Sequence, residues 1–255
     1  TALGKDALTS NTTGQKNIGI GIDCLQANTT GQSNVAVGSD SLDENTTGSD
    51  NTAAGGSSLG GNTTGNNNTA FGRRALLSNT TAHDNTAVGH DALRANTTGT
   101  MNVGIGNSAL SANTTANHNT AIGSYAMFVN TTGYHNVAIG NYALDALTSA
   151  DNNVVIGDNA GSALTTSGEN VIIGSYAVST GVLTGAQNIV IGRLAGQDLT
   201  SATKNVIMGW SAAKQATTSD ENVIIGYNAV GTGVLTGNNN IIMGESAGLN
   251  MTSGA

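Results

Sequence analysis

Residues 85–99 read NTAVGHDALRANTTG, and this pattern returns about every seventeen residues along the chain. We count its positions from the asparagine, so Asn85 is position one and Gly89 is position five. The asparagine recurs as Asn17, Asn34, Asn51, Asn68, Asn85, Asn102, Asn119, Asn136, Asn153, Asn170, Asn188, Asn205, Asn222 and Asn240. A glycine lies four residues after each of them, and Gly4 belongs to a truncated first copy. A fixed period of this length is the signature of a repeat architecture.

Positions two to four of each copy predict a short β-strand. Position two is Thr, Val or Ile, and position four is apolar in residues such as Val88 and Ile105, which are typical of strands. The glycine at position five predicts a backbone with positive φ or a close approach of another segment. The NTTG segment, as at Asn96 to Gly99, predicts the return turn, because Asn and Gly tolerate left-handed conformations and Asn and Thr side chains bond nearby backbone.

Together these features predict an all-β fold, a parallel β-solenoid of about fifteen coils with seventeen residues each. Helices are excluded because the repeat has no helical periodicity, and hairpins are excluded because two-residue turns are absent. Each coil is expected about 4.8 Å above the last. The asparagines at position one would then form a ladder of stacked amides.

Composition narrows the possible functions. Charged residues are 9% and aromatic residues 3% of the chain, and the net charge is −8. The few Lys and Arg residues are scattered, which argues against a nucleic-acid surface, and no apolar run approaches the ~18 residues of a membrane span. The chain begins and ends inside a repeat, so we expect it to be a segment of a longer protein. Cys24, the only cysteine, is expected to be a small buried side chain.

The residue at position three divides the chain into two predicted subregions of one continuous solenoid, 1–146 and 147–255. Before residue 147 the turns are mostly NTTG and position three is small, as in Ala36 and Ala87. Later strands read VVIG, VIIG or IIMG, and position three becomes Val or Ile, as in Ile207 and Ile224. Turn sequences change to forms such as LTSA at the same point, and two of the later coils are one residue longer.

The later strands predict an assembly of several chains. Alternation sends positions two and four to one face and position three to the other, and a strand that is apolar on both faces must be buried on both. One thin coil supplies one internal core, so the second face needs another surface. We therefore expect a parallel homotrimer, in which Ile207 and Ile224 matter for assembly. A wider monomeric solenoid, in which both faces meet internal side chains, is the alternative.

The segment NVAIG-x-x-A at Asn136 to Ala143 resembles the head repeats of trimeric autotransporter adhesins, and residues 85–99 resemble repeats of phage tail-fibre proteins. The resemblance covers essentially the whole chain and implies a left-handed β-roll in each of three chains. The adhesin repeat is shorter, so the extra turn residues here imply a different cross-section. No segment resembles the chaperone domain that often follows such tail-fibre repeats.

Chemical sites are sparse in this pattern. Asp6, Asp23, Asp40 and Asp91 share position seven, where a solvated acidic column is favoured over a calcium site. The four histidines have no zinc-type spacing. No nucleophile, base and acid can be grouped. We therefore assign no catalytic, cofactor-binding or metal residue, and we expect no enzyme activity and no cofactor.

Two kinds of surface residue suggest binding instead. Tyr125, Tyr142 and Tyr176 at position seven, and Trp210 and Tyr227 at position six, are outward aromatics that can stack on sugars or pack at a rim. Thr12, Thr29, Thr46 and Thr63 form part of a threonine column, as in a face that orders water.

The leading hypothesis is a structural fibre or adhesin segment, extracellular on a virion or a cell-surface appendage. It would space or present a host-attachment surface and contact a host glycan or receptor, with no nucleic-acid partner and no membrane insertion in this segment. The alternative hypothesis is an ice-binding β-solenoid.

Overall fold

The structure is a computed structural model that describes residues 1–251. It divides into two compact units, Thr1–Thr132 and a second unit that begins at Gly133. The predicted division at residues 146 and 147, which rests on the turn sequences and on position three, stays a prediction. Residues 252–255 of the predicted second subregion lie outside the described residues.

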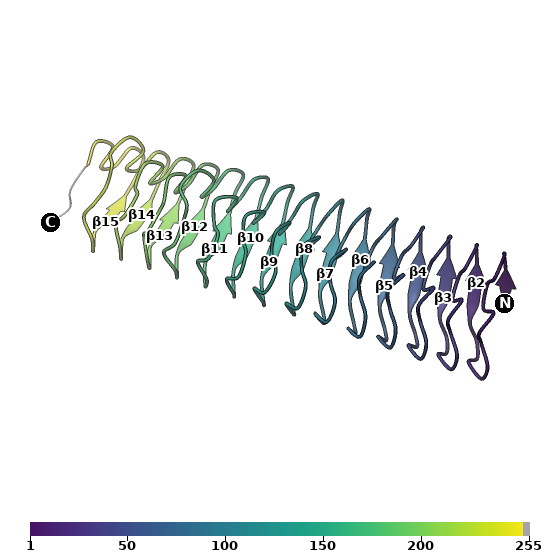
Figure 1. Cartoon of the computed structure of the whole chain (residues 1–255). Coiled ribbons are helices and arrows are strands. Elements are labelled where there is room, and N and C mark those ends of the chain that lie inside the picture. The colour runs from purple at the N-terminus through teal and green to yellow at the C-terminus, as the bar shows by residue number, and fades with distance from the viewer. Residues whose placement is uncertain (252–255) are drawn as a thin grey trace. The chain divides into compact units, whose positions relative to one another are not determined.

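The first unit is a parallel β-solenoid with one short strand per coil (Figure 1). Its strands are β1 (Ala2–Leu3), β2 (Ile18–Ile20), β3 (Val35–Val37), β4 (Thr52–Ala54), β5 (Thr69–Phe71), β6 (Thr86–Val88), β7 (Val103–Ile105) and β8 (Thr120–Ile122). Neighbouring strands pair in parallel with equivalent residues opposite, as in Val35 with Thr52. The predicted strand at positions two to four is confirmed.

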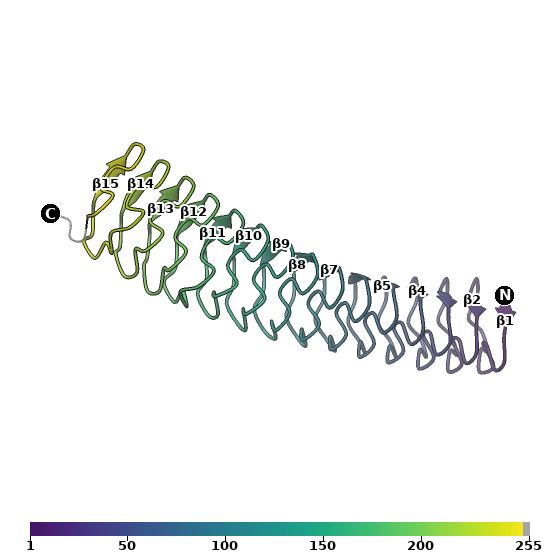
Figure 2. The same cartoon turned by 90° about the horizontal axis from the view of Figure 1, so that it is seen from above.

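The second unit repeats this arrangement (Figure 2). Its strands are β9 (Val137–Ile139), β10 (Val154–Ile156), β11 (Val171–Ile173), β12 (Ile189–Ile191), β13 (Val206–Met208), β14 (Val223–Ile225) and β15 (Ile241–Met243). The one-residue insertions do not disturb the register, because Val171 still pairs with Ile189 and Val223 with Ile241. The predicted all-β parallel solenoid is therefore confirmed in both units, whereas its left-handedness stays a prediction.

The glycine at position five is required by the backbone. Gly89 has a φ of 135°, and a Cβ added to it would lie 2.4 Å from the carbonyl oxygen of Gly106 in the next coil. No side chain fits at this distance, and few residues adopt this φ. The sequence-based expectation of positive φ and close backbone approach is confirmed on both counts.

The predicted asparagine ladder at position one is confirmed, and its geometry satisfies a buried amide. Asn51 is buried, and its Nδ2 donates to Oδ1 of Asn34 at 3.2 Å and to the carbonyl of Gly65 at 2.8 Å. Its backbone N–H also donates to Oδ1 of Asn34, at 3.0 Å. Each coil is thus bonded to the next by side chain as well as backbone, as buried polar groups require.

A second amide ladder runs through the first unit at position twelve, the Asn of the NTTG turn. Nδ2 of Asn45 donates to Oδ1 of Asn28 at 2.8 Å and to the carbonyl of Gly48 at 3.0 Å. In the second unit the same position becomes apolar and buried, as in Leu147, Leu164 and Leu199. The change in turn sequence near residue 147 is therefore also a change of core from amide to aliphatic.

Position three lies inside the chain's own core, which corrects one expectation drawn from the sequence. Ile207 and Ile224 are no more than 1% exposed in this single chain, so they do not form a face that another chain must cover. Their bulk is offset at position nine of the coil, which is Leu in most of the first unit and Gly, Ala or Val in all coils from Asn153 onward.

Two glycines show that positions three and nine meet. A Cβ added at Gly104, in position three, would lie 3.2 Å from Cγ of Leu93, in position nine. A Cβ added at Gly161, in position nine, would lie 3.2 Å from Cγ1 of Val155, in position three. Because interiors are close-packed, a larger residue at one position leaves less room for the residue at the other.

Candidate interaction surfaces

The side chains at positions two and four point out of the coil and form what we call the outward strand face. In the first unit its exposed apolar members include Ile20, Val37, Phe71, Val88 and Ile122. Threonine occupies position two in β4, β5, β6 and β8, so this stretch is mixed in character. The burial pattern of these strands is intermediate or exposed, then buried, then intermediate or exposed.

In the second unit the outward strand face is entirely apolar. Position two is Val or Ile and position four is Ile or Met in all strands from β9 to β15. These side chains are partly exposed, with Ile189 at 40% and Met208 at 37% among the more exposed ones. Because the strands pair in register, the residues form a contiguous patch, and monomeric proteins rarely expose such patches beyond a few hundred Å².

The acidic column at position seven does not gather its carboxylates into one site. Oδ1 of Asp23 accepts from Gln26, Oδ2 of Asp40 accepts from Ser39, and Oδ2 of Asp91 pairs with Arg74 at 2.7 Å. Within residues 1–251, no three His, Cys, Asp or Glu side chains are grouped so that they could hold a metal ion.

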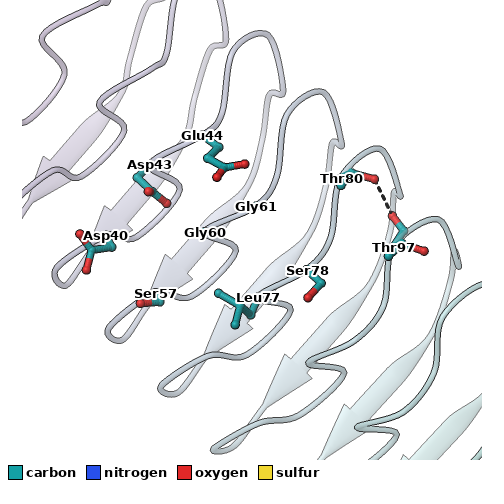
Figure 3. A pocket seen from close by; sticks show the side chains of 10 residues that line it. All are labelled: Asp40, Asp43, Glu44, Ser57, Gly60, Gly61, Leu77, Ser78, Thr80 and Thr97. Atoms are coloured by element: carbon teal, nitrogen blue, oxygen red, sulfur yellow. Dashed lines mark hydrogen bonds between the residues drawn. The ribbon is translucent and has the colours of Figure 1, made fainter.

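A surface cavity of about 520 Å³ lies beside this column in the first unit (Figure 3). Gly60 and Gly61 occupy positions ten and eleven, so this coil has no side chains there, while Asp43 and Glu44 precede them and Leu77 follows. Burial raises the pKa of Asp43 to about 6. The cavity is lined by carboxylates and by the hydroxyl groups of serine and threonine, which can form hydrogen bonds with a ligand.

A second cavity of about 370 Å³ lies in the second unit, at the return turns. It is lined by Tyr134, Asp151 and Glu169 among other polar residues. Oδ1 of Asp151 accepts the backbone N–H of Tyr134 at 2.8 Å, and this carboxylate raises the pKa of the Tyr134 phenol. Both cavities are acidic and favour neutral or cationic partners.

The threonines of the turn divide into two columns with different bonding. At position thirteen the hydroxyl bonds within the solenoid, as in Thr46, whose Oγ1 donates to the carbonyl of Thr63 at 2.9 Å. At position fourteen the side chains are exposed, as in Thr30, Thr47 and Thr64. A single exposed column of hydroxyl and methyl groups thus runs along the first unit.

Cys24 is fully buried, as the sequence predicts. Burial raises the pKa of its thiol, and Sγ donates to the carbonyl of Ile20 at 3.2 Å. A raised thiol pKa disfavours the reactive thiolate, so Cys24 has the character of a packing residue.

The outward aromatics fall into separate groups. Tyr125 packs edge-to-face on Phe128 at 5.3 Å between ring centroids, whereas Tyr142 and Tyr176 are 38% and 41% exposed. Trp210 and Tyr227 contact each other, also at 5.3 Å. Sequence reasoning identified these residues as outward, but it missed the Arg193 guanidinium over the Trp210 ring.

The described residues include no helix with the length and hydrophobicity that a membrane crossing requires. No family model matches the chain, and the searches of curated proteins and of solved structures found no match.

Proposed function

We propose that this chain is a structural segment of an extracellular fibre or adhesin, on a virion or a cell-surface appendage, and that it acts as a parallel homotrimer. The observation that carries the proposal is the apolar outward strand face of the second unit. Its Val, Ile and Met side chains are partly exposed in one chain, and burial of apolar surface is worth about 25 cal/mol per Å². In a single chain this apolar surface remains in contact with water, so an assembly that covers it would be stabilised.

A second copy of the same chain is the partner that fits this face. Ridges of side chains repeat once per coil, at the spacing of parallel strands, about 4.8 Å. A second solenoid has the same spacing. If it lay parallel and in register, its grooves would accept the side-chain ridges of the first. Closed cyclic symmetry would cover the face without leaving an apolar edge. Three chains are favoured by the resemblance to trimeric adhesin heads.

The proposed assembly is tested by the mass of the protein in solution. Multi-angle light scattering should give about three times the chain mass of 25.3 kDa. The double variant Met208→Asp/Ile225→Asp places charges on the outward strand face. It should shift the mass to that of one chain while the β-sheet circular dichroism signal remains.

Thr218→Asp, at the exposed position fourteen of the same region, is the matched control and should leave the mass unchanged. Ile224→Asp buries a charge in the core of one chain and should instead abolish the β-sheet signal. A wild-type mass of one chain, or a double variant that keeps the full mass, would contradict the assembly.

Ice binding is a second candidate function, favoured by the exposed threonine column at position fourteen. The column is one residue wide, because the neighbouring hydroxyls at position thirteen donate to backbone carbonyls. Thermal hysteresis of the purified chain at micromolar concentration would favour this function over a fibre role.

A further inference from the structure

Position six forms a solvent-facing column that is polar in most coils. It holds Lys5, Ser39, Arg73, His90 and Asn107 in the first unit, and Asn141, Asp158, Ser175 and Glu245 in the second. Charged side chains in these places would be costly in a buried interface, so the column remains in water in the proposed assembly. Trp210 and Tyr227 occupy two successive places in it.

These two aromatics are not core residues. Trp210 is 49% exposed and Tyr227 is 50% exposed. Their ring centroids are 5.3 Å apart with an interplanar angle of 87°, and Cζ of Arg193, one coil earlier, lies 5.7 Å from the centroid of the Trp210 ring. Arg193 forms no salt bridge with any carboxylate of residues 1–251.

The backbone under the three residues is fixed before any ligand arrives. The carbonyl of Arg193 accepts from the N–H of Ser211 at 2.9 Å, and that of Trp210 accepts from Asn228 at 2.8 Å. The carbonyl of Tyr227 accepts in the same way from Ser246. Each of the three residues also directly follows a position-five glycine, whose backbone packs closely against the equivalent glycine of the next coil. A preorganised surface loses little entropy on binding.

The small area of the cluster formed by Arg193, Trp210 and Tyr227 favours a small ligand over a protein partner. Trp and Tyr bury about 150–250 Å² each when fully covered, so two half-exposed rings and one arginine offer a few hundred Å² at most. A stable protein interface needs about 800 Å² per partner. The cluster is therefore too small for a protein and large enough for one or two sugar rings.

Sugar rings also match its chemistry. A pyranose has an apolar C–H face that stacks on an aromatic ring, and hydroxyl groups around its edge. The guanidinium of Arg193 presents several N–H donors in a fixed plane, and these can bond vicinal hydroxyls or a sugar carboxylate.

We propose that Arg193, Trp210 and Tyr227 form a glycan-binding platform on the solvent-facing side of the solenoid. This inference rests on the proposed attachment role for its purpose, but the platform lies within one chain and does not require the trimer. An open platform of this size binds weakly by itself, and display of several copies would raise the apparent affinity by avidity.

A printed array of bacterial and animal glycans tests the proposal. The labelled wild-type protein should bind at least one structural class of glycan. Trp210→Ala and Tyr227→Ala should each reduce that signal tenfold or more with unchanged circular dichroism. Tyr142→Ala removes another exposed tyrosine, outside the platform, and should leave the signal unchanged.

The chain has a single tryptophan, so selectively excited tryptophan fluorescence reports on this platform alone. Titration with the oligosaccharide found on the array should shift the Trp210 emission, and Arg193→Ala should weaken the apparent affinity at least tenfold. Absence of any bound glycan, or binding that survives Trp210→Ala, would overturn the proposal.

Light scattering distinguishes failure of the glycan-binding proposal from failure of the proposed assembly. A one-chain mass with intact glycan binding removes the trimer and keeps the platform. A mass that changes in Trp210→Ala would identify the cluster as a contact between copies of the chain, and the glycan proposal would fall.

Discussion

Three non-glycine residues in a typical coil have left-handed backbone conformations, at positions seven, nine and seventeen. In one coil these are Asp40, Leu42 and Asp50, with φ values of 56°, 52° and 58°. Such a conformation costs about 1–2 kcal/mol for most residues. Positions seven and seventeen are accordingly rich in Asp, Asn and Ser, which tolerate it. Leucine at position nine is retained because burying its side chain is worth about 1.5–3 kcal/mol.

Asp43 gives a pH-dependent prediction at the scale of one side chain. Burial raises its pKa to about 6, from about 3.9 in an unfolded chain, so the folded state favours the protonated form. Its stabilising contribution is complete below the unfolded pKa and is lost as the pH rises through about 6. Because the group is partly exposed, the charged form costs on the order of 1 kcal/mol after solvent screening.

Asp43→Asn should therefore raise the thermal midpoint at pH 8 and have little effect near pH 3.5. Differential scanning calorimetry at both pH values measures the difference. Asp50→Asn removes the same charge at an exposed position and serves as the control. A gain of equal size at both pH values would show that the cause is not ionisation of Asp43.

At the scale of one coil, stability depends on a shared volume between positions three and nine. Most earlier coils combine Ala with Leu, as in Ala87 and Leu93, whereas the coils from Asn153 onward combine a bulkier position three with a smaller position nine, as in Ile207 and Ala213. All four side chains are buried. The two combinations are alternative ways to fill the same internal volume.

This complementarity predicts a strongly coupled double variant. Ala87→Ile alone should overpack the coil and cost about 1–3 kcal/mol, and Leu93→Gly alone should leave a cavity and cost about 3–5 kcal/mol. The double variant should be more stable than the sum of the two by about 1–3 kcal/mol. Urea denaturation of the four proteins measures this coupling.

The matched control combines Ala87→Ile with Leu42→Gly, which lies several coils away in the same unit. These two changes share no contact and should add. Additive effects in the Ala87/Leu93 pair as well would contradict the packing of position three against position nine.

For the molecule as a whole, the Asn and Gly spacings were enough to predict the strands, the parallel register and the position-one ladder. They could not identify the inner face of the strand, because alternation only places positions two and four opposite position three. The inner face is indicated by comparing coils. Position nine is Leu93 where position three is Ala87, but it is Gly161 where position three is Val155.

The binding surface was only partly predictable. The repeat positions placed Trp210 and Tyr227 on adjacent coils, so their contact followed from the period. The position of the Arg193 guanidinium depends on side-chain rotamers, which no repeat pattern specifies. The cavity beside Gly60 and Gly61 likewise depends on tertiary packing, because the side chains of Asp43 and Leu77 lie close to the Gly60 backbone.

The amide ladder at position one has a consequence for how such a chain can change in length. Between coils, each asparagine bonds only to its equivalents in the two adjacent coils, so the contacts of Asn68 with Asn51 are the same as those of Asn51 with Asn34. Deleting residues 51–67 would bring Asn68 onto Asn34 with every ladder and strand still in register. Circular dichroism should retain the β-sheet signal, and thermal stability should change little, as expected for nearest-neighbour arrays.

Deleting residues 51–68 instead would also remove the position-one asparagine and shift the strand of the following coil by one residue, which turns its inward side chains outward. That variant should lose cooperative unfolding, and equal stability of the two deletions would contradict the ladder as the source of register. A chain built this way can gain or lose material only in whole coils. Unequal recombination between repeat copies would therefore produce folded variants that differ in length by whole coils. Single-residue insertions are tolerated only within a turn that can accommodate them, as before Asn188 and Asn240.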